Sequence, residues 1–214
     1  MGLLDRLATR RTDADVSPAL GVSVGDPVFS TKALRKFLRC LTSRESPVLL
    51  DLGPVVGSNV SFFGEQLGCK IFVEDIFADL DRHVREDRTE TLPAFLKGRL
   101  PQAEGAVDGI LCWDIFDYLD RKSAQELALQ LTRVLRPDGA LLGFFGTAQP
   151  RETRYTKYII VDEVNLRHRG YPAARSRQAA LLNRDIIRLF AGLRVSDSFL
   201  LQNNLREILF RKPS

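Results

Sequence analysis

The sequence has few of the residues that bind metals or form disulfides. It contains three cysteines and two histidines in 214 residues. Cys40, Cys69 and Cys112 lie far apart and include no CxxC pair, which argues against a disulfide framework and against structural zinc. Because His83 and His168 are the only histidines, we expect no metal site.

Long apolar runs are absent as well. No stretch approaches the roughly 20 apolar residues that a helix needs to cross a bilayer, and the opening MGLLDRLATRR lacks a secretory pattern. We therefore expect a cytoplasmic protein. Hydrophobic residues make up 44% of the chain and charged residues 27%, as in soluble globular proteins, which disfavours wholesale disorder. The net charge of +4 permits acidic partners without requiring them.

The domain organisation follows from length and from the first change of pattern. A chain of 214 residues is long enough for one domain and short for two. Residues 1–29 are polar, contain prolines and glycines, and show no sustained hydrophobic period, so we expect an N-terminal arm. Residues 30–214 form the predicted domain.

From residue 30 onward, helix and strand patterns alternate. A buried strand is predicted at residues 48–50, a helix at 60–67 and a second strand at 71–73. This order is a βαβ unit, whose two strands run parallel. Between its first strand and its helix lies DLGPVVG, with an aspartate at the strand end and two glycines four positions apart. Ligands of open parallel sheets bind beyond the carboxyl ends of the strands, which makes this turn a candidate binding site.

The second half of the chain continues the alternation and then breaks it. Strands are predicted at residues 107–112 and 140–145, with a helix between them, and a short strand near Leu96 would precede them. Residues 146–182 interrupt the rhythm and are rich in arginine and lysine. Two apolar segments then flank Asn203-Asn204, a dipeptide suited to a hairpin turn.

These motifs, in this order, resemble those of class I S-adenosylmethionine-dependent methyltransferases over about residues 30 to 212. DLGPVVG resembles the glycine turn D-x-G-x-G-x-G, and IFVED resembles the second strand with its acidic ribose ligand. VDGILCWDIFDYLD resembles the fourth strand with its loop, and LTRVLRPDGALLGFF resembles the L-x-P-G-G turn with the fifth strand. The resemblance implies an α/β fold: a Rossmann-like three-layer sandwich whose mostly parallel, seven-stranded sheet ends in an antiparallel hairpin.

The resemblance also implies S-adenosyl-L-methionine as the cofactor. The implied cofactor-binding residues lie at the carboxyl ends of predicted strands: Asp51, Gly53, Gly57, Asn59, Glu74, Asp75 and Trp113. Glycines 53 and 57 allow the ligand to approach the backbone closely, because no Cβ stands in the way. Asp51 would accept hydrogen bonds from the ligand's ammonium group, and Trp113 would cover part of the ligand. Asp75 is preferred over Glu74 as the acceptor for the ribose hydroxyls.

Val55 departs from the family pattern. It stands where the family turn has its middle glycine. Its branched side chain would crowd a ligand lying against the backbone, and it holds the turn only at negative φ.

The resemblance implies methyl transfer to an acceptor bound near Asp114 and Tyr118, the candidate catalytic residues. Tyr118 stands where many members have histidine, while Asp114 would alternatively cap the turn leading to Tyr118. Residues 146–182 occupy the place of the family's substrate or lid insertion. Basic residues within 151–188, interleaved with tyrosines, would suit nucleic acid, but CWDI stands where adenine-N6 methyltransferases have DPPY. A small-molecule acceptor is therefore favoured.

Two other functions are compatible with the sequence. A non-catalytic relative would keep the fold as a binding or scaffold protein. A nicotinamide-dependent Rossmann oxidoreductase is disfavoured, because GPVVGS lacks the GxGxxG pattern and the chain ends in a hairpin.

Overall fold

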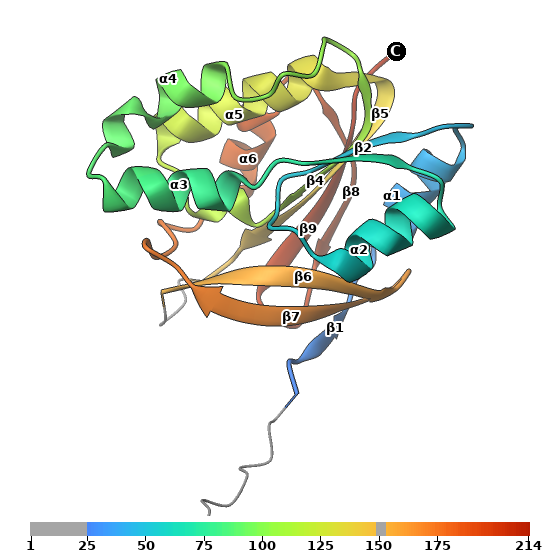
Figure 1. Ribbon diagram of the computed structural model, residues 1–214, viewed down its shortest axis with the longest axis horizontal. Helices are drawn as coiled ribbons and strands as arrows, with labels where there is room; N and C mark the ends of the chain where they lie inside the picture. Colours follow the sequence, from blue (N-terminus) through green and yellow to red (C-terminus); the bar gives the residue numbers. More distant parts are fainter. Residues whose placement is uncertain (1–24, 149–152) are drawn as a thin grey trace, which may run out of the picture.

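The computed structural model describes residues 25–148 and 153–214. Helices cover both faces of a mixed sheet of six strands, which gives the three layers predicted from the sequence (Figure 1). A second sheet of three antiparallel strands packs against this sandwich.

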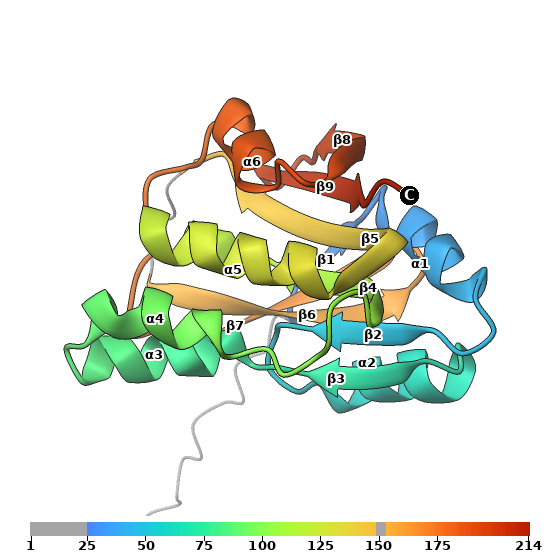
Figure 2. The same ribbon diagram turned by 90° about the horizontal axis from the view of Figure 1, so that it is seen from above.

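The large sheet runs in the order β3 (Lys70–Val73), β2 (Val48–Asp51), β4 (Val107–Trp113), β5 (Leu135–Gly146), β9 (Leu205–Arg211) and β8 (Arg194–Leu200). Figure 2 shows β3 at one edge and β8 at the other. The first four strands are parallel, whereas β9 is antiparallel to both β5 and β8. The predicted βαβ unit and final hairpin are confirmed. In the hairpin turn, Asn204 has a φ of 59°, a left-handed conformation that asparagine tolerates.

The helices divide between the two faces. One face is covered by α3 (Ile76–Arg85), α4 (Leu92–Lys97), α5 (Arg121–Val134) and α6 (Asn183–Leu189). The other is covered by α1 (Leu34–Thr42) and by a π-helical turn, Phe62–Gln66, that continues α2 (Gly57–Ser61). Successive residues of β4 point to opposite faces, so Cys112 packs in the first core and Trp113 in the second. Within the described residues, no helix is long and apolar enough to span a membrane.

The prediction of a seventh strand in this sheet was wrong. The residues around Leu96 form α4, and Leu92 and Leu96, one turn apart, are buried in the same core as α5. Pro93 lies in the first turn of this helix, where its missing N–H costs nothing. As a result β3 is an edge strand.

Residues 146–182, predicted as an insertion, contain an antiparallel hairpin made of β6 (Arg154–Asp162) and β7 (Asn165–Pro172). The small sheet is completed by β1 (Val28–Ser30), which comes from the end of the predicted N-terminal arm and pairs with β7. The remainder of the predicted arm, residues 1–24, lies outside the described residues. Figure 1 shows β6 and β7 crossing beneath the large sheet, and this small sheet closes over the site described next.

Candidate functional site

The glycine turn after β2 is covered by a tryptophan. Asp51 ends β2, and its Oδ1 accepts hydrogen bonds from the Gly53 backbone N–H at 2.9 Å and from Trp113 Nε1 at 2.6 Å. A Cβ placed on Gly53 would lie 2.8 Å from both Cδ1 and Nε1 of Trp113. Gly53 therefore permits a close approach to the backbone, and the group that approaches in this structure is the protein's own indole; approach by a ligand stays a prediction.

Trp113 is held in this position by stacking. It is 3% exposed, and its ring lies nearly parallel to that of Tyr158 in β6, with centroids 5.1 Å apart. Its φ of 50° lies in the left-handed region, which is strained for a bulky residue by about 1–3 kcal/mol. Such strain is frequent at functional sites, and here the strained backbone directs the Trp113 side chain toward the turn after β2.

Burial gives Asp51 a pH-dependent contribution to stability. Desolvation raises its pKa from 3.8 to about 6, although the Gly53 and Trp113 hydrogen bonds oppose the rise. Between about pH 4 and pH 6 the folded protein keeps a proton that the unfolded chain has lost, so stability falls as the pH rises through this window.

We expect Asp51→Asn to remove this part of the pH dependence. The free energy of unfolding of the variant, relative to wild type, should rise by about 2–3 kcal/mol between pH 4 and pH 7. Urea denaturation at a series of pH values measures it. A difference that stays constant across the window would contradict the assignment.

The other end of the turn is open. Val55 is 66% exposed, and the crowding of a ligand by its side chain stays a prediction. Gly57 is exposed, and a Cβ added to it would meet no atom within 4 Å. In this structure Trp113 covers the Gly53 side of the turn, whereas the Gly57 side is uncovered.

Asn59, a predicted cofactor ligand, joins α2 to the small sheet. Its Nδ2 donates to the Tyr158 carbonyl at 2.8 Å, and its Oδ1 accepts from the Ile160 N–H at 2.9 Å. Both ends of the buried amide are therefore used in holding β6 over the glycine turn.

Asn59→Ala should loosen that attachment. It leaves two buried backbone groups of β6 without partners, at a cost of about 1–3 kcal/mol each. We expect faster hydrogen exchange at the Ile160 amide and a lower free energy of unfolding. Ser58→Ala, at an exposed neighbour, is the matched control, and equal effects of the two variants would contradict the role given to Asn59.

The two acids at the tip of β3 have different surroundings. Glu74 forms an ion pair with Arg99 and accepts a hydrogen bond from Gln102 Nε2 at 3.0 Å. Its carboxylate is therefore used in structural contacts with these two residues. Asp75 caps α3 by accepting from the Ala78 N–H at 3.0 Å. Desolvation raises the pKa of Asp75. The backbone N–H of Glu74 donates to the Asp51 carbonyl at 2.7 Å, which brings the tips of β2 and β3 together.

A buried ion-pair cluster lies beyond β4. Asp114 and Asp117 are 0% and 4% exposed; Asp114 precedes the 3-10 turn Ile115–Asp117, and Asp117 is its last residue. Arg177 Nη2 donates to Asp114 Oδ2 at 2.6 Å, and Arg177 Nε lies 3.5 Å from Asp117 Oδ2. Asp117 Oδ2 also accepts from the Gly146 N–H at 2.8 Å. The cluster therefore joins the ends of β4 and β5 to the segment that follows β7.

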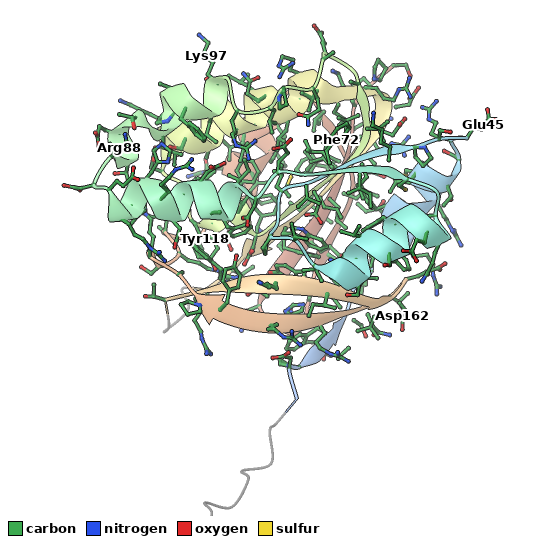
Figure 3. All side chains as sticks on the ribbon, in the orientation of Figure 1. Glu45, Phe72, Arg88, Lys97, Tyr118 and Asp162 are labelled. Carbon is green, nitrogen blue, oxygen red and sulfur yellow. The ribbon has the colours of Figure 1, made fainter. Side chains whose placement is uncertain are left out.

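Burial changes the acid–base character of this cluster. Desolvation raises the pKa of Asp117 to about 7, and it raises the pKa of Asp114 against the opposing effect of Arg177. The pKa of Tyr118 is raised far above its usual value by desolvation and by the charge of Asp114. The Tyr118 hydroxyl donates to the Arg154 carbonyl at 2.7 Å, and Figure 3 shows this side chain between α3 and the small sheet. Of the two candidate catalytic residues, Asp114 is the one whose raised pKa makes it a better proton acceptor than an ordinary carboxylate.

Of the three tyrosines predicted to stack on nucleic acid, Tyr155 and Tyr158 are buried and Tyr171 is half-buried. Tyr155 packs edge-on against Phe77 and Tyr118, with centroids 5.1 and 4.8 Å apart, and Tyr158 stacks on Trp113. Neither ring face is available at the surface. The small sheet turns these large apolar rings inward because they cover the ends of the parallel strands.

Sequence reasoning missed Asp117, Tyr158 and Arg177 as members of the site. The spacing of Asp114 and Asp117 within one turn was a usable signal, since residues three apart lie on one side of a helical turn. Arg177 had no comparable signal, because 63 residues separate it from Asp114.

Comparison with known proteins shows similarity in structure alone. No protein-family model and no curated protein sequence matches the chain. Among solved structures, a 1,6-didemethyltoxoflavin-N1-methyltransferase from Burkholderia thailandensis superposes with a TM-score of 0.51 at 16% identity, covering 85% of this chain and 79% of that one. The chain has the methyltransferase fold.

Two further methyltransferase structures agree with this fold. An S-adenosylmethionine-dependent methyltransferase from Aquifex aeolicus gives a TM-score of 0.50 at 14% identity, covering 84% of this chain and 89% of that one. The CcbJ methyltransferase from Streptomyces caelestis gives a TM-score of 0.50 at 14% identity, covering 84% of this chain and 95% of that one. The α/β Rossmann-like fold predicted from the sequence is confirmed, whereas the large sheet has six strands and not the predicted seven.

Proposed function

We propose that this protein is an S-adenosyl-L-methionine-dependent methyltransferase that acts on a small-molecule acceptor. The observation that supports it most is the meeting of the Asp51–Gly53 turn and Asp75 at adjacent strand tips, joined by the 2.7 Å hydrogen bond from the Glu74 N–H to the Asp51 carbonyl. The Burkholderia thailandensis protein with the same fold was solved with S-adenosylhomocysteine and a small-molecule acceptor.

The residue types at this site suit such a cofactor, and the indole of Trp113 must move for the cofactor to bind. Asp75 would accept hydrogen bonds from the ribose hydroxyls, and the bare backbone of Gly53 would lie against the amino-acid portion. Displacement of the indole would free Asp51 Oδ1, which now accepts from Trp113 Nε1. The cofactor supplies a methyl group carried on a cationic sulfur.

The chain's own contribution would be orientation, exclusion of water and proton acceptance. Alignment of reacting groups in a dry site supplies much of the acceleration in such transfers. Tyr158, which is buried in the small sheet over the strand ends, would exclude water from the ends of β2 and β4. Asp114 would take a proton from an acceptor that must lose one.

Asp75→Ser provides a direct test of cofactor binding. Serine is a good helix cap, so α3 should be retained, while the charged hydrogen bonds to the ribose are lost. We expect the affinity for S-adenosylhomocysteine, measured by calorimetry, to fall by about 1.5–3 kcal/mol. Glu86→Gln, at an exposed acid beyond the other end of α3, is the control. Unchanged affinity in Asp75→Ser would remove the role from Asp75.

A non-catalytic protein with the same fold is the second candidate. The observation that favours it is the position of Trp113, whose indole atoms lie where a Cβ of Gly53 would be. Trp113 is the only tryptophan, so its fluorescence reports directly on the turn. A heat of binding together with a change in fluorescence on adding S-adenosylhomocysteine supports the enzyme, and neither signal at millimolar ligand supports the non-catalytic protein.

A further inference from the structure

Three buried oxygen atoms beyond β4 have no hydrogen-bond partner among the described residues. They are Oδ1 of Asp114, Oδ1 of Asp117 and the hydroxyl of Tyr158. All three residues are more than nine-tenths buried. The Tyr158 hydroxyl lies close enough to Asp114 to lower the pKa of that carboxyl. Buried polar atoms are normally paired, so these atoms indicate a place for a donor.

The charges of the cluster indicate that a donor bound to these atoms would be a cation. Two carboxylates share the single guanidinium of Arg177. His168, whose ring packs on Tyr158, adds no charge near neutral pH, because burial and Arg177 lower its pKa to about 4. The surplus negative charge is relieved by a proton on Asp117, whose pKa is about 7. A cationic group that takes the place of the guanidinium would meet the same two carboxylates.

The position of Arg177 shows how a ligand would enter. It lies between β7 and α6 in residues 173–182, which form neither helix nor strand. Its side chain is 14% exposed, whereas those of Asp114 and Asp117 are 0% and 4% exposed. The guanidinium therefore stands between solvent and the two carboxylates.

We propose that Asp114, Asp117 and Tyr158 form a binding site for the protonated amino group of an alkylamine, which enters in exchange for the side chain of Arg177. A primary ammonium has three donors and no acceptor, which suits the unpaired carboxylate oxygens of Asp114 and Asp117 and the lone pairs of the Tyr158 hydroxyl, whose own O–H points toward Asp114. A carboxylate or phosphate ligand would be repelled by the two acids. Amine binding does not depend on the proposed methyl transfer and is tested without any cofactor.

The test compares butylamine with 1-butanol, which differ in the charged head group. Binding is followed by the fluorescence of Trp113, which stacks on Tyr158. We expect saturable binding of butylamine to wild type and none of 1-butanol. Arg177→Ala should bind butylamine about tenfold or more tightly, because the competing side chain is gone. Adding Asp114→Asn to that variant should reverse the gain.

Two further variants keep the test decisive. If Arg177→Ala does not fold, Asp117→Asn in the wild-type background should weaken butylamine binding by about tenfold, whereas Glu45→Gln, at an exposed acid, should leave it unchanged. Equal responses to butylamine and 1-butanol, or amine binding that survives the change at Asp114 or Asp117, would overturn the proposal. Loss of S-adenosylhomocysteine binding with amine binding intact would instead count against the methyltransferase activity alone.

Discussion

Replacing Arg177 with methionine is expected to lower the free energy of unfolding by about 3–5 kcal/mol at pH 8. Methionine keeps much of the side-chain volume but leaves the carboxylates of Asp114 and Asp117, both buried, without their cation. The folded protein can relieve this by keeping both acids protonated, since their folded pKa values lie above the unfolded value. The loss of stability should therefore be smaller at pH 5 and grow as the pH rises through about 7.

Urea denaturation of wild type and Arg177→Met at several pH values measures this effect. Arg184→Met is the matched control, because the side chain of Arg184 is 73% exposed and lies 3.9 Å from its partner carboxylate. An exposed pair contributes about 0–1 kcal/mol. Adding Asp117→Asn to Arg177→Met should restore part of the stability. A cost no larger than that of Arg184→Met would show that the cluster does not depend on the guanidinium.

Trp113→Ala is expected to have opposite effects on stability and on cofactor affinity. Loss of a buried tryptophan costs about 3–5 kcal/mol of folding free energy, and here it also removes the stack on Tyr158 and the hydrogen bond to Asp51. The same change opens the space against Gly53. In wild type the indole must leave its place against Gly53 before the ligand binds, and this displacement costs free energy. Affinity for S-adenosylhomocysteine should therefore rise in the variant by about tenfold for each 1.4 kcal/mol of that cost.

Trp113→Phe separates the two roles of the indole. It retains aromatic packing against Tyr158 but deletes the Nε1–H that donates to Asp51, so the loss of stability should be smaller, about 1–3 kcal/mol. Calorimetry with S-adenosylhomocysteine and urea denaturation on both variants complete the experiment. Binding by a folded Trp113→Ala protein at or below wild-type affinity would contradict the view that the indole covers the ligand's place.

Features that depend on neighbours in sequence were predictable. The apolar run before Asp51, the glycine that follows it and the acids after β3 place a turn at the tip of a parallel strand, because the backbone there needs residues without bulk and strands need apolar side chains on both faces. The final hairpin followed in the same way from Asn203-Asn204 between two strand patterns. These local signals were sufficient to identify the fold class.

Features that depend on long-range packing were not predictable. The segment around Leu96 has a strand-like apolar content, but its leucines one turn apart bury themselves beside α5, and packing overrode the expected strand. Tyr158 was expected on the surface and instead covers Trp113. The difference arises because the small sheet lies across the strand ends, a placement that no local pattern encodes.

The amino-acid sequence by itself determined the order of elements, the glycine turn and the acids at the tips of β2 and β3, since each rests on backbone preferences and hydrophobic period within a few residues. Only the tertiary structure decided what those residues contact. Asp51 accepts a hydrogen bond from Trp113, which lies 62 residues away in the sequence, and Asp114 accepts one from Arg177, which lies 63 residues away. Desolvation and pairing act through space, so the charge, pKa and accessibility of the site follow from packing.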